Sequence, residues 1–379
     1  MLAVLFLVLA LTGAAIGDAA RADGGLPAWS LKTCAQGSTP AVIAHRRVCL
    51  RAGQRCAPEL ARAYRKYGWR CPLSSRLERI PPSVGTTIAD ISGAGGQDVA
   101  AGEGAIWLVS AGGGVLFRVD PERNTVVDQL QLPLPASQQP YSLVSGIAAG
   151  EGGVWVSLPG RDEVARIDPA TDAIVARIPV GEAPAGIALT PGSVWVANRF
   201  GRSVSRIDAL TNRVVATIEL AQGQGEGPTL IAAGAGGVWV VDRGGGDVVR
   251  IDPVTNGIAA VIPVQLPPNT PGPVAGILAD AATGVWVAGA DLMRIDPDTN
   301  RVIATVRTLA LPVGLAVGLG SVWETSWSGW GAPGPVYRID PATNTVVGES
   351  NLGFFYSNPA VAFGSVWLQG RDLLRIRPR

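Results

Sequence analysis

Residues 192–208 read GSVWVANRFGRSVSRID, and this stretch decides the fold because its pattern recurs along the chain. A Trp lies inside a run of Val, a short loop follows, and the triplet Arg-Ile-Asp ends the next apolar run. Short β-branched runs bounded by turn residues are typical of strands, and the stretch has no apolar period of 3.6 residues. We therefore expect two consecutive strands here, and the same pair wherever the pattern returns.

The pattern returns at seven tryptophans, spaced 37 to 48 residues apart. These residues are Trp107, Trp155, Trp195, Trp239, Trp286, Trp323 and Trp367. A period near 43 residues is typical of propeller blades or another repeat array. Each unit holds four short apolar strands, which is the content of one blade. In the second strand the Trp is expected on one face and its flanking Val residues on the other.

The two ends of the repeat region complement each other. The last unit has three strands, because the chain stops after LLRIRPR at 373–379, whereas GTTIADI at 85–91 resembles a fourth strand and precedes the first complete unit. One strand from the front can complete the last blade and remove the open edges. The predicted fold is all-β: a seven-bladed β-propeller of four-stranded blades over residues 81–379, closed by an N-terminal strand.

A hairpin of constant sequence ends the third strand of six units. Asp ends the strand, Pro supplies the φ that the second turn position needs, and Asn adopts the left-handed conformation that closes the hairpin. The repeated Asp residues are therefore predicted to be turn caps and not catalytic carboxylates: Asp120, Asp168, Asp208, Asp252, Asp296 and Asp340. The Arg two residues before each Asp is expected either to stack on a Trp or to pair with the Asp.

The first 22 residues resemble a secretory signal peptide. Their apolar run, residues 2–16, is shorter than a membrane span, and ARA at 20–22 offers a cleavage site. No Lys or Arg precedes the run, so an uncleaved anchor and a misassigned start codon remain open. The expected location is secreted or extracytoplasmic, with association with the cell surface.

Residues 23–80 are predicted to form a separate basic module. They hold eleven Lys and Arg against three Asp and Glu, whereas residues 81–379 hold nineteen against twenty-six. All four cysteines lie in this module: Cys34, Cys49, Cys56 and Cys71. An even number of Cys in an exported segment predicts two disulfides, and a zinc site that uses His45 is the alternative.

A short helix is expected inside this module, between Pro58 and Gly68. A helix of about ten residues spans roughly 15 Å. Cys56 and Cys71 flank this helix, so they are not expected to be partners, and the pairing is otherwise left open. The basic charge suggests attachment to an anionic surface, with the acidic propeller of the same chain as the alternative partner.

The repeat VWVAN…SVSRIDALTNRVVATIEL, in residues 194–220, resembles the YVTN-type β-propeller repeat, which is related to the streptogramin (virginiamycin B) lyase-like propellers. The resemblance covers residues 85–379 and implies fold more strongly than activity. Such lyases use a histidine base, and residues 81–379 contain no His, so no position receives that role. The segment 49–71 resembles a small Cys-containing module that accompanies exported bacterial proteins.

Candidate ligand-binding residues gather around the ends of the second strands. Two extra tryptophans, Trp327 and Trp330, interrupt the repeat in ETSWSGWGAPGP at 324–335. Exposed aromatics of this kind anchor carbohydrate or protein partners, although they can also cover the end of a blade. The other aromatic and charged candidates are Tyr141, Tyr356, Asn198, Arg199, Asp242, Arg243 and Glu324. Lactonase-like propellers collect carboxylates and an Asn around a divalent metal, and Asn198, Asp242 and Glu324, which follow a second-strand Trp by three, three and one residues, could approach the channel mouth in the same way.

The predicted function is that of an extracytoplasmic binding or scaffold propeller, without catalytic activity. The alternative is a metal-dependent lyase or hydrolase of the streptogramin-lyase or lactonase type. No organic cofactor is expected, and a bound divalent metal is left open. The expected partner is a protein or a cell-wall polymer at the propeller mouth. Nucleic acid is not expected, because no nucleic-acid motif accompanies the basic residues, and the chain is expected to be a monomer.

Overall fold

The structure of the 379-residue chain is a computed structural model. It describes residues 34, 36–43, 46–71, 76–79, 81–92, 98–110, 114–133, 146–220, 227–242, 246–264, 276–289, 291–308, 311–327, 334–353, 359–370 and 372–378. The chain divides into two compact units, Met1–Arg79 and Ile80–Arg379. No helix among the described ranges is long and apolar enough to cross a membrane.

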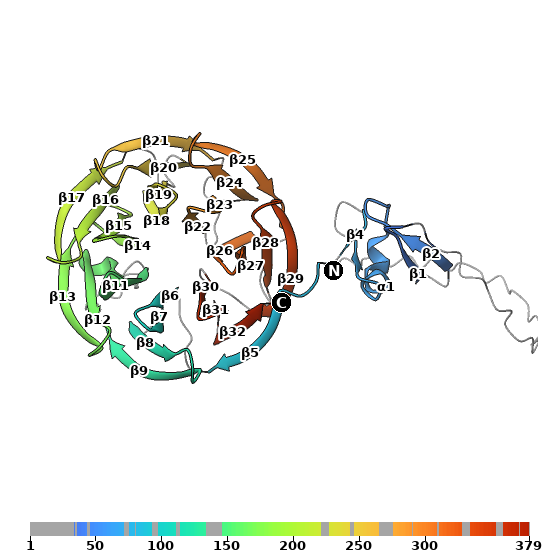
Figure 1. Ribbon diagram of the computed structural model, residues 1–379, viewed down its shortest axis with the longest axis horizontal. Coiled ribbons are helices and arrows are strands. Elements are labelled where there is room, and N and C mark those ends of the chain that lie inside the picture. Colours follow the sequence, from blue (N-terminus) through green and yellow to red (C-terminus); the bar gives the residue numbers. More distant parts are fainter. Residues whose placement is uncertain are drawn as a thin grey trace, which may run out of the picture. The chain divides into compact units, whose positions relative to one another are not determined.

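The second unit is a seven-bladed β-propeller of four-stranded blades (Figure 1). Blade 1 contains β6 (Asp98–Gly102), β7 (Ala105–Val109), β8 (Val115–Asp120) and β9 (Thr125–Gln131), and blade 2 contains β10 (Ile147–Gly150), β11 (Gly153–Leu158), β12 (Glu163–Asp168) and β13 (Ala173–Pro179). Blade 3 contains β14 (Pro184–Thr190), β15 (Ser193–Asn198), β16 (Ser203–Asp208) and β17 (Arg213–Glu219), and blade 4 contains β18 (Pro228–Gly234), β19 (Gly237–Asp242), β20 (Asp247–Ile251) and β21 (Ile258–Pro263).

Blades 5 to 7 complete the ring. Blade 5 contains β22 (Ile277–Asp280), β23 (Gly284–Ala288), β24 (Leu292–Asp296) and β25 (Arg301–Val306), and blade 6 contains β26 (Leu311–Gly318), β27 (Ser321–Trp327), β28 (Gly334–Asp340) and β29 (Thr345–Gly353). Blade 7 contains β30 (Ala360–Ala362), β31 (Ser365–Gln369), β32 (Leu373–Pro378) and, from the front of the repeat region, β5 (Gly85–Ile91). The predicted closing strand is confirmed: β5 pairs antiparallel with β32.

Each seam between neighbouring blades holds one hydrophobic cluster. The Trp of one blade faces the next blade around the ring: Trp155 of blade 2, for example, packs with Val194 and Val196 of blade 3. All seven repeat tryptophans are at most 1% exposed. Each indole nitrogen donates a hydrogen bond within its own blade, as Trp155 Nε1 does to Gly150 O at 3.0 Å. The buried polar group is therefore satisfied while the ring fills the seam.

The repeated Asp residues are turn caps, as predicted. Asp208 Oδ1 accepts hydrogen bonds from the backbone nitrogens of Leu210 (3.1 Å) and Thr211 (2.7 Å), and Asn212 has the left-handed φ of 56°. The other five hairpins repeat this cap, which fixes their geometry with local bonds. The amides of Arg123 and Glu122, for instance, hold the pKa of Asp120 below its usual range.

The predicted stacking of the repeat arginines is also confirmed, and the arginines reach further than expected. Arg206 Cζ lies 4.9 Å from the ring centroid of Trp195 in its own blade. Its Nη1 then donates to the next blade, to Pro253 O at 2.7 Å and Asn256 Oδ1 at 2.8 Å. We call this arrangement the Arg latch. The partner is thus the hairpin Asn of the next blade and not the Asp two residues away.

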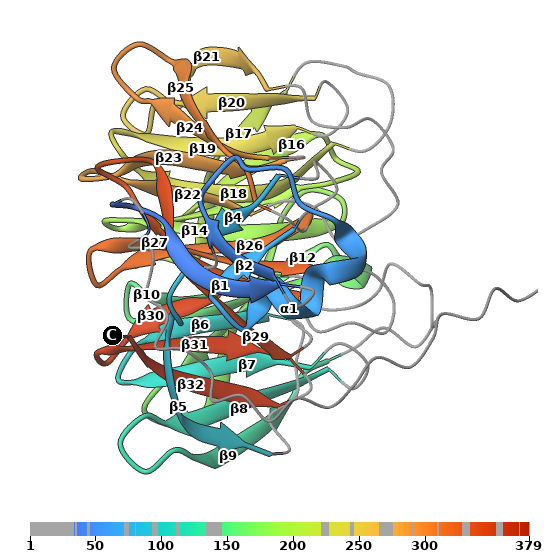
Figure 2. The same ribbon diagram turned by 90° about the vertical axis from the view of Figure 1, so that its right-hand side faces the viewer.

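The ends of the strands form two edges of the ring, which is seen from the side in Figure 2. The hairpins between first and second and between third and fourth strands share one edge, which we call the hairpin face. The second-to-third connections and the links between blades share the other edge, which we call the loop face. This division follows from the antiparallel order of the four strands in every blade.

The first unit is small and stapled by disulfides. It contains β1 (Thr39–Ile43), β2 (Arg46–Leu50), the 3₁₀ turn η1 (Pro58–Leu60), α1 (Ala61–Arg65), β3 (Trp69–Arg70) and β4 (Glu78–Arg79). Its core gathers Leu50, Tyr64, Trp69 and Leu77. Cys34 is bonded to Cys49 and Cys56 to Cys71, so the alternative of a zinc site is wrong.

The expectation that Cys56 and Cys71 do not pair is wrong as well. Their Cα atoms lie 5.8 Å apart. The predicted ten-residue helix is only a 3₁₀ turn of three residues followed by five residues of α-helix. Gly68 then has a left-handed φ of 75°, which turns the chain back so that Cys71 returns to the start of the helix.

Candidate functional site

The two faces of the propeller differ in how strictly they repeat. On the hairpin face the turns between third and fourth strands are short and similar: 121–124, 169–172, 209–212, 252–257, 297–300 and 341–344. On the loop face the links between blades range from 180–183 and 307–310 to 132–146 and 264–276. The residue three positions after the Trp also changes from blade to blade, from Leu158 to Asn198 to Asp242. Variation is therefore concentrated on the loop face.

Polar side chains replace apolar ones at the loop-face ends of several second strands. Asn198 is fully buried at the end of β15, and its Nδ2 donates to Ser203 Oγ (3.1 Å) and Ser205 Oγ (2.9 Å) of β16. Its Oδ1 is buried without a hydrogen-bond partner. Asp242 ends β19 in blade 4 and is 5% exposed. Each of these groups sits within its own blade, below the surface.

Glu324 is the most unusual of these residues. It follows Trp323 in β27 and is fully buried on the strand face that packs against blade 5, where the other six blades have Val or Leu. Ser326 Oγ donates to its Oε1 at 2.6 Å, whereas its Oε2 has no hydrogen-bond partner. Burial raises the pKa of Glu324 to about 7, opposed by hydrogen bonds from Ser326 and Thr308 and assisted by the charge of Asp291.

A second carboxyl with a raised pKa lies at the start of the innermost strand of blade 1. Asp98 begins β6 on the loop face, at a place where blades 2, 3, 5 and 6 have glycine. Its Oδ1 accepts a hydrogen bond from Val99 N at 2.9 Å, and the backbone of Ile147 in blade 2 donates as well. Desolvation outweighs these bonds and raises the pKa of Asp98 to about 7.

The remaining predicted site residues are only partly placed. Arg199 is half-buried, with its Cζ 5.1 Å from the ring centroid of Phe200. Trp327 is the last residue of β27, and its side chain lies outside the described residues. Trp330, Tyr141, Tyr356 and Arg243 lie outside the described residues altogether. Their roles stay predictions, as do those of Asn198, Asp242 and Glu324.

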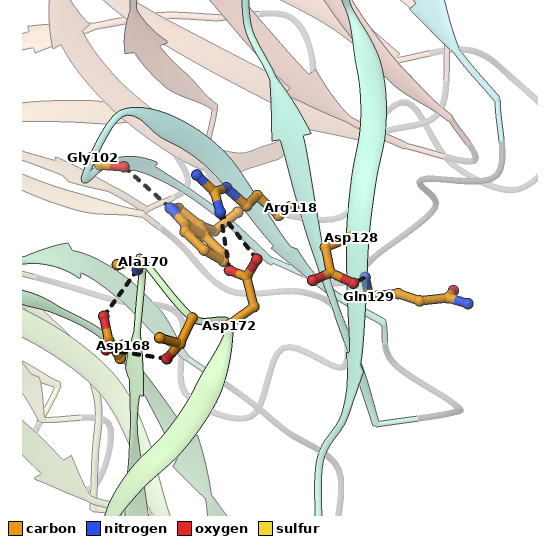
Figure 3. A network of polar contacts seen from close by, with 9 residues as sticks. Gly102, Arg118, Asp128, Gln129, Asp168, Ala170 and Asp172 are labelled. Atoms are coloured by element: carbon orange, nitrogen blue, oxygen red, sulfur yellow. Dashed lines mark hydrogen bonds and ion pairs between the residues drawn. The ribbon is translucent and has the colours of Figure 1, made fainter.

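On the hairpin face a charged hollow of about 910 Å³ surrounds the last hairpin of blade 1. Residues from blades 7, 1 and 2 line it, and they include Arg375, Arg118, Asp128 and Asp172. Figure 3 shows Arg118 reaching Asp172, with Asp128 beside them. Arg118 Nη1 bonds both carboxylate oxygens of Asp172, at 3.3 and 3.0 Å.

This network is a departure from the Arg latch. Asp172 stands where five other hairpins have Asn, and Asp128, opposite Arg118 in the sheet, stands where the other blades have Ala or Gly. Burial raises the pKa of Asp172 above its usual range, and a hydrogen bond shared with the Asp128 carboxyl adds to the rise, while Arg118 opposes it. Blades 1 and 2 are thus joined through two carboxyls and one guanidinium.

Sequence reasoning missed Asp98, Asp128 and Asp172. The signal that could have found them was present, because each breaks the repeat at a position that is Gly, Ala or Asn in most other units. Among the described residues, no group of three or more His, Cys, Asp and Glu side chains is arranged to hold a metal ion. A metal site built on such a group therefore finds no support in this part of the chain.

Comparisons with known proteins agree on the architecture. No protein-family model matches the chain, and no curated protein does either. Among solved structures, a virginiamycin B lyase from Staphylococcus aureus shares 16% identity and a TM-score of 0.60, over 76% of this chain and 96% of that one. A streptogramin B lyase shares 18% identity and a TM-score of 0.59, over 78% and 96%. A chain of the Kuenenia stuttgartiensis hydrazine synthase has 13% sequence identity to this chain and a TM-score of 0.62, over 75% of this chain and 96% of that one. At these identities the likeness shows a common fold: this chain has the seven-bladed propeller of the streptogramin lyase-like structures, which confirms the resemblance seen in its repeats.

Proposed function

We propose that the protein is an extracytoplasmic binding or scaffold propeller that recognises a protein or a cell-wall polymer at its loop face. The observation that carries the proposal is the contrast between the two faces. A hairpin face that repeats from blade to blade serves the ring itself, whereas connections that differ in every blade suit a surface that recognises one asymmetric partner. The two disulfides indicate an oxidising compartment, which supports export.

The test is co-sedimentation of the full chain with purified cell-wall polymer, peptidoglycan first, using variants on the two faces. On the loop face these are Arg199→Ala and the double variant Trp327→Ala/Trp330→Ala. On the hairpin face they are Leu210→Ala and Val254→Ala, which lie at hairpin tips with 89% and 86% exposure. We expect the loop-face variants to bind at least about ten times more weakly, with an unchanged melting temperature.

The hairpin-face variants are the control, because they remove exposed apolar surface from the opposite face of the ring. Loss of binding in Leu210→Ala or Val254→Ala, with normal binding by the loop-face variants, would place recognition on the opposite face. A large drop in melting temperature for the Trp variants would show that these residues cover the end of blade 6 instead.

A second candidate is a metal-dependent lyase or hydrolase. It is favoured by the two loop-face carboxyls, Asp98 and Glu324, whose pKa values near 7 suit a general acid or base. The test is incubation of a streptogramin B with the full chain and Mg²⁺ at pH 7, followed by mass spectrometry. Conversion of the streptogramin B to a new product, abolished by Asp98→Asn or Glu324→Gln, would support this candidate over the binding propeller.

A further inference from the structure

The seam between blades 5 and 6 differs from the other six seams in one chemical respect. The other six seams are filled by apolar side chains from the second strands, and the position after the Trp supplies one of them. In blade 6 this position is Glu324, a carboxyl with an exposed fraction of 0%. Burying a carboxyl among apolar groups is costly unless another group compensates it.

The hydrogen bonds of Glu324 compensate only part of that cost. Ser326 Oγ donates to Oε1 at 2.6 Å, and the Thr308 hydroxyl, which follows β25 in blade 5, bonds the same carboxyl. Oε2 has no partner. A buried carboxylate oxygen without a hydrogen-bond partner calls for an explanation, and a bound ion is one that would satisfy it.

A second carboxylate lies in the neighbouring blade. Asp291, in the turn between β23 and β24 of blade 5, lies near enough for its charge to act on Glu324. Arg307 does little to neutralise it, because Arg307 Nε is 3.9 Å from Asp291 Oδ2 and the Arg307 side chain is 89% exposed. The Asp291 side chain is 35% exposed, so the two carboxyl groups differ in burial: Glu324 is fully buried and Asp291 is accessible to solvent.

We define Glu324 and Asp291 as the seam carboxylates, and Ser326 and Thr308 as the seam hydroxyls. We propose that the seam carboxylates and seam hydroxyls bind one hard divalent cation, with Ca²⁺ as the best fit. Two carboxylates and two hydroxyls offer an all-oxygen set, and Ca²⁺ takes six to eight oxygens in flexible geometry, with water completing the shell. The set contains neither His nor Cys, which does not suit zinc or copper.

The proposed site accounts for the polar character of this seam. A cation would take up the unused Oε2 and would offset the repulsion between the seam carboxylates. Because the ligands come from blades 5 and 6, the cation would also tie the two blades together. The seam carboxylates lie on the loop-face side of the ring, but cation binding and cell-wall binding are measured with different ligands and different variants, so either proposal can fail without the other.

The experiment is calorimetric titration of the chelator-treated full chain with Ca²⁺, and in parallel with Mg²⁺, at pH 7.5. We expect one equivalent of Ca²⁺ with a Kd of about 0.1–1 mM, the range of extracellular Ca²⁺ modules. Glu324→Gln keeps the shape of the side chain and removes its charge, so it should weaken Ca²⁺ binding by about ten-fold or more. Asp90→Asn, which alters an exposed carboxylate of β5, is the control and should bind as the parent does.

Asp291→Asn provides a second test at a partly exposed position, in case Glu324→Gln does not fold. It should also weaken Ca²⁺ binding, and in both variants Ca²⁺ should no longer raise the melting temperature. The proposal is overturned if the parent binds no Ca²⁺ up to about 10 mM, which lies beyond that range. It is equally overturned if Glu324→Gln or Asp291→Asn binds Ca²⁺ like the parent, since Glu324 would then simply be a protonated seam residue.

Discussion

Arg375 in the last blade donates a hydrogen bond from Nη1 to Asn124 Oδ1 in the first blade, at 2.9 Å and across 251 residues of sequence. The same guanidinium lies over Trp367, with Cζ 4.8 Å from the ring centroid, and also bonds Pro121 O. The ring is therefore closed twice, once by the pairing of β5 with β32 within blade 7 and once by a side chain that bridges blades 7 and 1.

The Arg latch repeats around the ring with two exceptions. For blade 1 the acceptor is a different residue type, and for blade 6 the neighbouring blade has no hairpin to receive the Arg. Arg166, Arg206, Arg250 and Arg294 reach the hairpin Asn of the following blade. Arg118 reaches Asp172 instead. Arg338 faces blade 7, whose strands β32 and β5 are not joined by a hairpin, and its Nε donates to Ser321 Oγ in its own blade.

Removing the acceptor at the closing seam tests the Arg latch. Asn124→Gly keeps the left-handed backbone, since Asn124 has a φ of 56°, and deletes only the amide that receives Arg375. We expect the free energy of unfolding, measured by urea titration, to fall by about 1.5–3 kcal/mol, the usual contribution of a hydrogen bond to a charged group.

The matched control is Ala235→Gly, a left-handed position (φ 47°) whose side chain has no polar atom. It should change the free energy of unfolding by no more than about 0.5 kcal/mol. Equal effects of the two substitutions would mean that the backbone, and not the bond to Arg375, accounts for the loss.

Replacing Asp128 tests whether the polar network of Figure 3 lowers the free energy of unfolding of the propeller. Asp128→Ala restores the residue type of the other blades and leaves Asp172 alone with Arg118. We expect the free energy of unfolding at pH 7 to rise by about 0.2–1 kcal/mol, the usual size of a surface charge pair. Glu122→Ala, which removes an exposed carboxylate from the same hollow, should have no such effect.

The pH dependence sharpens this test. The pKa of Asp172 is raised, so the folded state binds its proton more tightly than the unfolded state, and stability falls as pH rises above the unfolded value. Without the shared hydrogen bond from Asp128 this fall should become shallower. A parent and variant with identical pH profiles between pH 4 and 7 would show that Asp128 does not act on Asp172.

The sequence was sufficient for the architecture because the fold is a repeat. One Trp per unit, two apolar faces per strand and six similar hairpins determine blade number, strand order and even the closing strand at 85–91. The partner of each Arg could not be read in the same way. Arg206 and Asn256 are 50 residues apart, and only the geometry of neighbouring blades brings them together.

The wrong expectation about the disulfides and the missed burial of Glu324 also have local causes. A continuous helix makes Cys56 and Cys71 unexpected partners, whereas the chain turns back at Gly68 after only a short helix and brings them together. Glu324 was recognised as a candidate, but its burial was not. Strand alternation places it on the face opposite Trp323, inside a seam, so its position was in principle accessible from the sequence.

Reduction of the disulfides should unfold the first unit selectively. Its core rests on few side chains, among them Tyr64 and Trp69, and such a small unit depends on its two disulfides for about 2–5 kcal/mol each. Because all four cysteines lie between residues 34 and 71, a reductant cannot act on the propeller directly. We expect trypsin to cut the reduced chain first at Arg51, Arg62 or Arg65. Early cuts after residue 80 would contradict this order.

Asp98 should make the stability of the propeller fall as the pH rises. Its pKa is about 7 in the folded state, against an ordinary value of 3.8 for an Asp carboxyl, so folding takes up a proton between these two pH values. Protonated Asp98 therefore contributes its full stabilisation below about pH 4, and this contribution is lost as the pH rises towards 7. Above that pH the lost contribution to the free energy of unfolding is about 2–4 kcal/mol.

The test is Asp98→Asn, which keeps an oxygen for the Val99 amide and carries no charge. The variant should therefore match the parent in urea unfolding at pH 4.5 and exceed it at pH 8. Asp90→Asn, on an exposed position of β5, should shift neither value. If Asp98→Asn and the parent have parallel pH profiles, the Asp98 carboxyl is solvated and ionises normally, and its role as a loop-face acid or base would lose its physical basis.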